Sequence, residues 1–357
     1  MNTKSFFWLF ITLIYGISCL DKKTPSKKTM VFIPNQFSKQ FGIAQSEQPA
    51  LTLFYINNKD TIWISQPAKP FDKLKIIVLS TVFSSYFSEL NAQHHIYGVD
   101  DKNFYYDTVL LQQLKNGNSN EYAKKGNIDE ERLLLSGADI LIGTSFNNFS
   151  SAFKTRLEKS GIQLIVCDNY TEQHPLARAE WIRFFGALIN KLSAADSIFN
   201  QISINYSEIK NQTPLPNKPV VMIESIFSGV WNVSGGNSYT AKLIKDAGGK
   251  YVFEQDSALF SYAFNLETVL KKASNSDIWL HPGVFLNAKS MLAEEKRYTF
   301  FKPMQTKQIF NNNQRVTKQG GNDFWEKGVV RPDLILKDLS RIFRNQTDSL
   351  FFYRKVD

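Results

Sequence analysis

The chain has 357 residues and a formal net charge of +9, and 43% of its residues are hydrophobic. This length suggests about two domains, and the apolar content is ample for their cores. No apolar run in the chain, the N-terminal one included, reaches the roughly 20 residues that a transmembrane helix needs. In a cytosolic protein the positive charge would suggest nucleic acid as a partner. The partner that the charge implies therefore depends on the compartment of the protein.

The N-terminus predicts export. Residues 1–18 contain one lysine and an apolar run that is shorter than the roughly 20 residues a transmembrane helix needs, and Cys19 follows a serine. We interpret residues 1–18 as a signal peptide and Cys19 as the lipid-attachment site of a bacterial lipoprotein, although Gly16 stands where the lipobox usually has a bulkier aliphatic. An uncleaved anchor with an incidental cysteine is the alternative. Residues 19–29 are polar and lysine-rich, and they predict a flexible tether.

Export gives the charge a different meaning. The lysines then form a solvated surface, and we expect no nucleic acid partner. Several acyl chains on Cys19 would hold the protein at a membrane surface, since one chain alone binds only marginally. With Cys19 lipidated, Cys167 has no disulfide partner and is expected to be an inert buried thiol. We therefore expect a monomer in the periplasm, lipid-anchored to the cell envelope membrane.

The chain then shows two alternations of strand-like and helix-like segments. Residues 30–70 predict a β-rich preface with hairpin chemistry at residues 57–60. Short apolar runs separated by helical segments predict one α/β lobe over residues 71–175 and another, with a C-terminal tail, over residues 217–357. The predicted strands are 75–80, 96–100, 139–145 and 163–168 in the first lobe, and 220–226 and 277–283 in the second. The predicted helices of the second lobe include 238–249 and 331–343.

Residues 176–210 lie between the lobes and carry apolar side chains at helical spacing. A single helix of this length would extend about 50 Å, and its stiffness would limit the movement of the lobes. We therefore predict a largely preformed cleft. The predicted fold class is α/β, with two Rossmann-like lobes joined by one long α-helix and preceded by an N-terminal β-hairpin preface.

The two lobes share a sequence pattern. Asn127 precedes Asp139 by twelve residues, and Asn265 precedes Asp277 by the same number. In both segments an acid follows the asparagine, an apolar helix comes next, and Asp-Ile opens a strand. Asparagine can cap a helix, and an acid in the first turn suits the helix dipole. We interpret the pattern as two related lobes; the alternative is chance similarity between helix-to-strand units.

Five segments carry a resemblance to a known family: KIIVLST (75–81), EQHPLARAEWIRFFGALINKLSAADSIF (172–199), VSGGNSYTAKLIKDAGG (233–249), NNNQRV (311–316) and GGNDFWEKGVVRPDLILKDL (320–339). Over about residues 40–355 the chain resembles the helix-linked (class III, TroA- or cobalamin-binding-like) periplasmic substrate-binding proteins. These serve ABC importers of iron–siderophore complexes, haem and cobalamin, and the narrower resemblance is to lipoproteins of Bacteroidetes type. It implies capture of a metal–organic ligand for an inner-membrane permease, with no catalysis and no resident cofactor.

The resemblance also implies how the permease is recognised. In such relatives an acid on an outer face of each lobe docks to arginines of the permease. The segment NIDEERLLL puts Glu131 in that place in the first lobe. The matching segment of the second lobe, SGGNSYTAKL, has Asn237 there, so a second docking acid is not assigned.

Open α/β sheets bind ligands beyond the carboxyl ends of their strands, so we expect the cleft walls in the loops that follow the strands, including the segment 320–328. Aromatic side chains recur there, and their faces suit flat chelates and tetrapyrrole-like rings. Lys102, Arg315 and Asp323 are expected to contact the polar rim of the ligand. Several of the aromatic residues are alternatively core residues, and Trp231 and Trp325 are favoured for contact. The candidate ligand-binding residues are Tyr86, Lys102, Phe104, Tyr105, Tyr106, Trp231, Tyr239, Arg315, Asn322, Asp323, Phe324 and Trp325.

Two other functions remain as alternatives. A direct carrier of Zn or Mn ions needs several converging imidazoles and carboxylates, and of the four histidines only His281 lies at a predicted strand end. An envelope hydrolase is the weaker alternative. The chain has no GxSxG, HExxH, GxGxxG or phosphate-binding Gly-Lys-Ser/Thr motif, and Asp323 and Glu326 have no evident catalytic partner.

Overall fold

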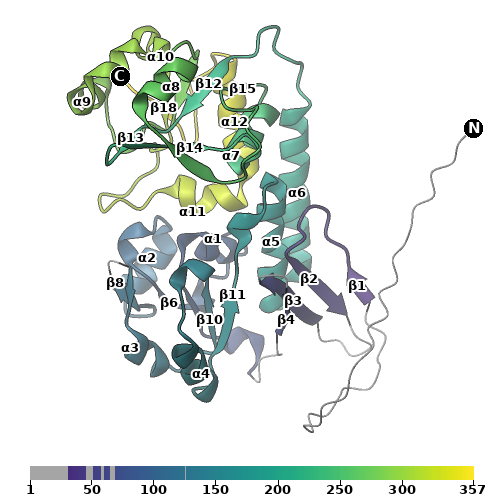
Figure 1. The fold of residues 1–357 in the computed structure, drawn as a ribbon. Coiled ribbons are helices and arrows are strands. Elements are labelled where there is room, and N and C mark those ends of the chain that lie inside the picture. The colour runs from purple at the N-terminus through teal and green to yellow at the C-terminus, as the bar shows by residue number, and fades with distance from the viewer. Residues whose placement is uncertain (1–30, 46–50, 58–59, 65–68, 125) are drawn as a thin grey trace, which may run out of the picture.

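The computed structural model describes residues 31–45, 51–57, 60–64, 69–124 and 126–357. The predicted signal peptide, Cys19 and the tether lie outside the described residues. Figure 1 shows two α/β lobes stacked one above the other, with a pair of helices along one side and a small β-sheet beside those helices. Within the described ranges, no helix combines the length and the hydropathy that crossing a bilayer requires.

The preface forms a four-stranded antiparallel sheet in the order β1-β2-β3-β4. β3 pairs with β4 up to Asn57 opposite Asp60, which confirms the predicted hairpin, although its two middle residues lie outside the described residues. Glu180 joins this sheet to the body, because its carboxylate accepts three backbone N–H groups of residues 36–38 at 2.6–2.8 Å. The strands are β1 (Val31–Ile33), β2 (Phe41–Gln45), β3 (Leu51–Asn57) and β4 (Asp60–Ile64).

The first lobe is built on a parallel sheet in the order β11-β10-β5-β6-β7. Its four main strands confirm the predicted ones. The strands are β5 (Ile76–Val78), β6 (Ile96–Val99), β7 (Asn120–Glu121), β10 (Ile140–Gly143) and β11 (Gln163–Val166), with a small hairpin of β8 (Ala123–Lys124) and β9 (Asn127–Ile128). The helices are α1 (Thr81–Glu89), α2 (Thr108–Lys115), α3 (Glu130–Leu134) and α4 (Ser151–Lys159).

The second lobe has a sheet in the order β15-β12-β17-β18-β19, in which only β19 is antiparallel within the described chain. A second sheet, β13-β14-β16, lies beside it. The strands are β12 (Val220–Ile223), β13 (Ile226–Phe227), β14 (Val230–Ser234), β15 (Lys250–Tyr251), β16 (Ser261–Phe264), β17 (Ile278–Leu280), β18 (Ile309–Asn311) and β19 (Arg354–Lys355). The helices are α7 (Tyr239–Asp246), α8 (Leu266–Ala273), α9 (Ala288–Glu294), α10 (Lys302–Thr306), α11 (Asp323–Val330) and α12 (Pro332–Phe343).

The two lobes are built alike. The order β11-β10-β5-β6 in the first sheet corresponds to β18-β17-β12-β15 in the second. Asp139 accepts the backbone N–H of Lys75 at 2.9 Å, and Asp277 accepts that of Val220 at 2.8 Å. Each carboxylate therefore holds the start of the neighbouring strand, and the shared sequence spacing has a shared structural role.

The helix caps of the two lobes differ in one detail. Asn265 caps α8 by accepting the backbone N–H of Thr268, as the pattern predicts. In the first lobe the corresponding cap is Asp129, whereas Asn127 lies in β9, so the prediction of a cap at Asn127 is wrong. The first-lobe helix is shorter because the β8–β9 hairpin occupies the residues before it.

The prediction of a single helix over residues 176–210 is wrong. The segment forms α5 (Pro175–Leu188) and α6 (Leu192–Lys210), separated by a turn in which Asn190 adopts a left-handed backbone with φ of 58°. Asparagine tolerates this conformation better than most residues. Gly186 permits a close return of the chain, because a Cβ at this position would lie 2.5 Å from the Cβ of Ala195.

The two helices are antiparallel. His174, at the start of α5, lies 6.3 Å from Tyr206 near the end of α6, measured between ring centroids. α5 is buried on nearly all sides and α6 buries one face. The apolar spacing therefore continues through the turn and resembles that of one helix. A long helix does join the lobes, but it is α6 alone, and its 19 residues extend about 28 Å. One continuous cluster of buried apolar side chains runs from the preface through α5 into both lobes.

Candidate functional site

The prediction of a loop over residues 320–328 is wrong from Asp323 onward, because these residues form the first part of helix α11. This helix lies between the lobes and packs against α1 and α5 (Figure 1). Asn322 caps this helix by accepting the backbone N–H of Phe324 at 3.0 Å. Asp323 then occupies the first turn, where the helix dipole favours an acid. The Asn-Asp pair therefore starts a helix at the lobe boundary.

The N-terminal half of α11 is joined to the first lobe by Glu326. Its carboxylate accepts the backbone N–H groups of Tyr106 at 2.5 Å and Asp107 at 3.2 Å. Burial raises the pKa of Glu326 to about 8, against the opposing effect of these two hydrogen bonds. Gly321 makes the approach possible, because a Cβ there would lie 2.2 Å from the carbonyl oxygen of Tyr105.

Ion pairs complete this contact between the lobes. Glu89 of α1 faces Lys327 at 3.1 Å and Arg331 at 3.5 Å. Arg315 donates from Nε to Asp323 at 2.6 Å, and its guanidinium lies 5.0 Å from the ring centroid of Tyr106. Arg315 and Asp323 therefore bind each other in the present arrangement, and the same pairing opposes the rise that burial causes in the pKa of Asp323.

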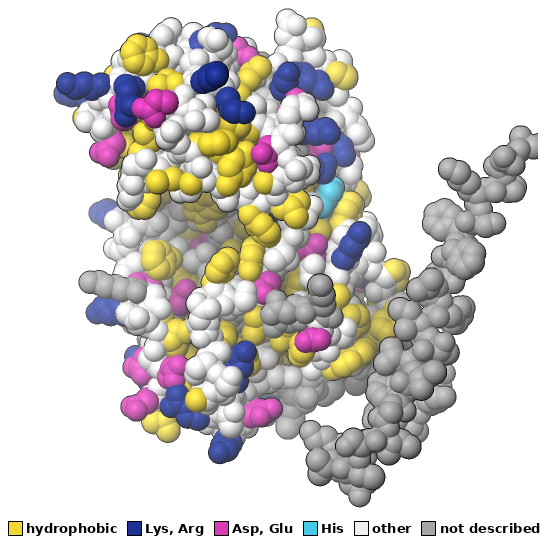
Figure 2. Space-filling view, viewed as in Figure 1, with side chains coloured by type: hydrophobic (Ala, Val, Ile, Leu, Met, Phe, Trp, Pro, Cys, Tyr) yellow, Lys and Arg dark blue, Asp and Glu magenta, His cyan; other side chains and the backbone are white. Residues whose placement is uncertain are grey.

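A cavity that both lobes line, called the main cavity below, lies on the other side of α11 and has a volume of about 240 Å³. Figure 2 shows a recess between the lobes with hydrophobic side chains along it. Both lobes supply the walls, since Tyr170 comes from the first lobe, Arg178 from α5 and the other lining residues from the second lobe. The lining residues are Tyr170, Arg178, Ser234, Ser238, Tyr239, Thr240, Leu243, Ile244, Leu259, Phe260, Ser261, Leu280, His281, Phe324, Trp325, Val329, Ile335, Leu339 and Tyr353.

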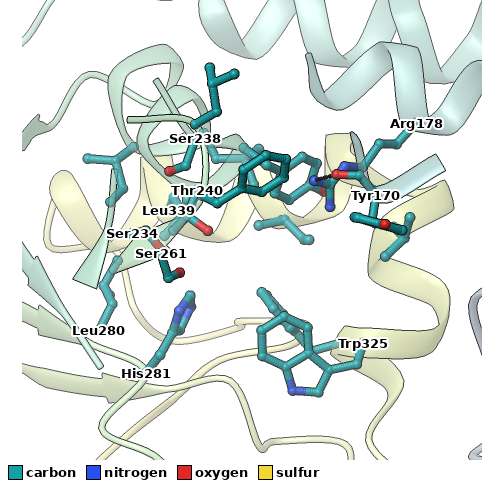
Figure 3. A pocket seen from close by; sticks show the side chains of 18 of the residues that line it. Tyr170, Arg178, Ser234, Ser238, Thr240, Ser261, Leu280, His281, Trp325 and Leu339 are labelled. Carbon is teal, nitrogen blue, oxygen red and sulfur yellow. Dashed lines mark hydrogen bonds between the residues drawn. The ribbon is translucent and has the colours of Figure 1, made fainter. Parts of the chain in front are cut away.

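Arg178 is the cationic group of this cavity, and Figure 3 shows it across the cavity from His281 and Trp325. Its Nε donates to the carbonyl oxygen of Glu172 at 2.8 Å, and its Nη2 donates to that of Tyr170 at 2.6 Å. Its guanidinium also lies 4.2 Å from the ring centroid of Tyr239. Burial lowers the pKa of Arg178 from its ordinary value. Because the described part of the chain provides Arg178 with carbonyl oxygens and a ring but no ion pair, its charge is available to an anion.

Tyr239 provides a second polar group. Its hydroxyl is buried and has no hydrogen-bond partner among the described residues. Burial raises the pKa of Tyr239 to about 12, with Arg178 acting in the opposite direction, so the hydroxyl stays protonated at neutral pH. A buried hydroxyl without a partner is costly, which makes it a point where a polar ligand atom would be stabilised.

His281 lies at the carboxyl end of β17 with a left-handed backbone, φ 54°. Its Nε2 is 2.5 Å from the hydroxyl of Tyr353, and the two rings are stacked. Burial lowers the pKa of His281 to about 3, so the imidazole is neutral at physiological pH. Among the described residues, no group of three or more His, Cys, Asp or Glu side chains is placed to hold a metal ion.

Six of the predicted ligand-binding residues lie close to α11. Tyr239, Phe324 and Trp325 line the main cavity, and Trp325 is 54% exposed at its edge. Tyr106, Arg315 and Asp323 line a second cavity of about 230 Å³ on the opposite side of α11. The structure therefore divides these residues between two cavities.

The remaining predicted residues lie elsewhere. Tyr86, Tyr105 and Trp231 are fully buried in the cores of the lobes, as the alternative interpretation of the aromatic residues allowed. Their rings turn inward: the hydroxyl of Tyr86 donates to the carbonyl of Arg178, that of Tyr105 donates to Asp100, and Trp231 stacks on Trp279. Asn322 serves as the cap of α11. Phe104 is exposed, and Lys102 pairs on the surface with Glu121.

Sequence reasoning missed several cavity residues. Arg178 lies in the segment 176–210, which was predicted to be one long helix that joins the lobes. Its side chain was therefore not considered as a ligand contact. Tyr170 follows a predicted strand, where a loop search would have found it. Tyr353 and Phe260 lie in the C-terminal tail and in a connecting segment that carried no motif.

The predicted docking position is exposed. Glu131 lies at the surface of α3 in the first lobe, and Asn237 is exposed just before Ser238, the cap of α7. Both positions are therefore accessible to a partner. Of the two, only Glu131 has a carboxylate.

The sequence and the fold of the chain both resemble those of known proteins. No known family model matches the chain. It is 27% identical over 190 residues to the uncharacterized lipoprotein MJ0878 of Methanocaldococcus jannaschii, a match that covers 52% of this chain and 44% of that protein. The uncharacterized lipoprotein MJ0872 of the same organism is 27% identical over 165 residues, covering 43% of this chain and 41% of that protein. The chain thus spans less than half the length of these two relatives.

Three solved structures share the fold over most of this chain at low identity. The TroA-like periplasmic binding protein FepB from Veillonella parvula has a TM-score of 0.58 at 16% identity, covering 83% of this chain and 97% of its own. The periplasmic heme-binding protein HutB of Vibrio cholerae has a TM-score of 0.58 at 16% identity, covering 74% and 98%. IsdE of S. aureus, complexed with heme, has a TM-score of 0.56 at 18% identity, covering 76% and 99%. The chain therefore has the two-lobed α/β fold of TroA-like periplasmic binding proteins.

Proposed function

We propose that this chain is the substrate-binding lipoprotein of an ABC importer, and that it captures an iron complex (a siderophore or haem) or cobalamin between its lobes. The observation that carries the proposal is the main cavity, where aromatic rings from both lobes surround a partly buried arginine that has no carboxylate partner among the described residues. Three neighbours in fold bear names that refer to periplasmic binding or to heme, which supports the same function.

The walls of the cavity suit a flat, partly anionic ligand. The rings of Phe260, Phe324 and Trp325 offer apolar faces, and burial of such faces is favourable. Arg178 offers a desolvated positive charge, and a charge-assisted hydrogen bond to a carboxylate or other oxyanion is about twice as strong as a neutral one. The unpartnered hydroxyl of Tyr239 lies beside it. Together these groups would hold an aromatic or chelate face and one acidic substituent.

The size of the cavity limits how such a ligand binds. Its volume of about 240 Å³ is below the roughly 300–1,000 Å³ of typical ligand pockets. A bulky chelate would therefore extend beyond the cavity and cover the exposed rings of Phe260 and Trp325 at the edge. Separation of the lobes at α11 would enlarge the space further.

The alternatives find less support in this cavity. A carrier of free Zn or Mn ions would need several donors, whereas among the described residues that line the cavity there is one histidine and no carboxylate or thiol. The Nε2 of that histidine is already engaged by Tyr353. A hydrolase would need a nucleophile beside a base, and among the described residues the hydroxyls of Ser234, Ser238 and Ser261 form no hydrogen bond with the imidazole.

Localisation and partners are part of the same proposal. Lipid on Cys19 would hold the protein at the envelope membrane, and two of the relatives are named lipoproteins. Glu131 would dock to the permease from its exposed position on α3. The protein would act as a monomer, because a closed pair of lobes already supplies both walls of the site.

Ligand-induced stabilisation tests the proposal. The purified chain is heated with a ferric siderophore, haem or cobalamin, and with Zn²⁺ and Mn²⁺ as controls. One of the complexes should raise the unfolding midpoint, because a ligand that binds only the folded state stabilises it by RT ln(1 + [L]/Kd). Mass spectrometry should recover that complex unchanged. Stabilisation by the free ions alone, or chemical conversion of the complex, would refute the proposal.

Arg178→Gln and Arg297→Gln make a matched pair for this assay. Arg297 is an exposed arginine that pairs with Glu267 and Glu295, far from the cavity lining. The first substitution should remove most of the ligand-induced shift and the second should leave it unchanged.

A further inference from the structure

The outer face of the preface sheet carries a row of aromatic side chains. Phe32 of β1 contacts Phe54 of β3 with ring centroids 6.1 Å apart, and Phe54 contacts Trp63 of β4 at 4.9 Å. The ring of Phe54 lies over Gly42 of β2, where a Cβ would be 2.1 Å from it. This aromatic stripe (Phe32, Phe54 and Trp63) therefore crosses all four strands.

The stripe is not needed for the core of the sheet. Successive side chains of a strand point to opposite faces, and the other face packs inward. Ile43, Leu53 and Tyr55 are buried there, and Phe41 contacts Trp181 of α5 with ring centroids 4.9 Å apart. Among the described residues, this inner face and the loop held by Glu180 join the sheet to the body, and the fold assigns no packing role to the outer face.

Two residues of the stripe are largely exposed. Phe32 is 57% exposed and Trp63 is 48% exposed. Single exposed apolar residues are ordinary, but a contiguous aromatic group that spans a sheet marks an interaction surface. The contacts between these rings also fix their positions, which lowers the entropy that binding would cost.

The start of the chain indicates the partner. β1 begins at Val31, twelve residues after Cys19, so a tether anchored at Cys19 reaches at most about 40 Å. Four lysines lie within residues 19–29, and lysines near a membrane are attracted to anionic lipids. Tryptophan and other aromatic rings favour the level of the lipid headgroups. Within the described residues, the aromatic stripe thus includes the strand nearest in sequence to the proposed anchor.

We propose that the aromatic stripe lies on the lipid bilayer and holds the protein body in a fixed orientation at the membrane. The proposal rests on the lipoprotein part of the proposed function. Because Glu180 fixes the loop before β2 to α5, the sheet would transmit this orientation to both lobes. The acyl chains would then supply attachment and the rings would supply orientation.

Fluorescence quenching tests the proposal with the full chain. The lipidated protein is reconstituted in vesicles of phosphatidylcholine and phosphatidylglycerol that contain phospholipids brominated near the headgroup. Brominated lipid should quench part of the tryptophan emission, and Trp63→Phe, which keeps an aromatic ring, should lose that quenched part. Equal quenching of the wild type and of Trp63→Phe would overturn the proposal.

Binding without the anchor gives a second measurement. Cys19→Ala in the chain that starts at residue 19 carries neither acyl chains nor the apolar run of residues 1–18. It should sediment with the same vesicles, and adding Phe32→Ser and Trp63→Ser should weaken this partition at least about tenfold, given the apolar area removed. Phe300→Ser, which alters an exposed ring of the second lobe, is the matched control and should have no effect. Equal partition of all three proteins would contradict the proposal.

A second copy of the chain is the competing occupant. Dimerisation in analytical ultracentrifugation that the Phe32→Ser and Trp63→Ser substitutions abolish would assign the stripe to that interface and overturn the membrane proposal. Ligand binding is measured in solution at the cavity between the lobes, so failure of one proposal is distinguishable from failure of the other.

Discussion

Glu326→Gln is expected to remove a pH dependence from the stability of the protein. The side chain of Glu326 is buried between the lobes, and burial raises its pKa from 4.5 to about 8. An unfolded chain releases this proton near pH 4.5, whereas the folded chain keeps it until about pH 8. The folded state therefore binds more protons in this range, and the free energy of unfolding falls as the pH rises.

The size of the effect follows from the same values. Each pH unit between 4.5 and the folded pKa costs about 1.4 kcal/mol, and the loss levels off above it. Between pH 6.5 and 8.5 the loss is therefore about 2 kcal/mol for this group. Glutamine cannot ionise, but its carbonyl still accepts the backbone N–H of Tyr106, as the protonated carboxyl does.

Thermal or denaturant unfolding at pH 6.5, 7.5 and 8.5 measures this difference. The wild type should lose stability across the series relative to Glu326→Gln, and Glu267→Gln, at an exposed carboxylate, should follow the wild type. Parallel pH profiles for the wild type and Glu326→Gln would refute the reasoning. The two backbone hydrogen bonds would then outweigh burial and hold the carboxylate ionised.

Three further predictions concern the cleft. Arg178→Gln should weaken binding of an anionic chelate about 10- to 100-fold, the value of one charge-assisted hydrogen bond, and titration calorimetry would show the loss. Trp325→Ala should weaken binding about tenfold and leave the circular dichroism spectrum unchanged, because the ring is mostly exposed; unchanged affinity would remove Trp325 from the site. Gly321→Ala should push the lobes apart, because the new Cβ would lie 2.2 Å from the carbonyl oxygen of Tyr105. Small-angle scattering should then give a larger radius of gyration, and an unchanged radius with unchanged stability would contradict the close contact.

Much of the fold was predictable because it depends on patterns that survive in a single sequence. Short apolar runs within 75–80 and 139–145 identify buried parallel strands, and the structure has β5 and β10 there. Asp139 and Asp277 each follow an asparagine by twelve residues, and this shared spacing predicts related lobes. In the structure both carboxylates hold the start of a strand. These signals are local, so they do not depend on how the lobes meet.

The turn between α5 and α6 was not predictable from periodicity. Apolar spacing reports that a face is buried, and two antiparallel helices that bury their faces in one core give the same spacing as one rod. The only local signal is Asn190, which supplies the left-handed residue of the turn. Glycine at 186 becomes meaningful only once Ala195 is known to lie against it.

The ligand site was predictable only in outline. Position after a strand places a residue near the cleft, but it does not give the direction of the side chain. Tyr105 and Trp231 follow this rule, yet their rings fill cores, whereas Trp325 is directed outward. Arg178 was missed because its helix was assigned a purely mechanical role. Its significance depends on the absence of an acidic partner among the described residues, which only the packing shows.

The antiparallel arrangement of α5 and α6 has a consequence for how the chain can be divided. Within the described residues, the chain passes from the first lobe to the second once, through α6, and the residues that follow it, 211–219, are mostly exposed. α6 packs against α12 of the second lobe, so a protease cut after residue 210 would leave two fragments in contact through a helix pair. Such fragments, produced separately, should reassemble, and their reassembly in the presence of cargo would make a two-part sensor.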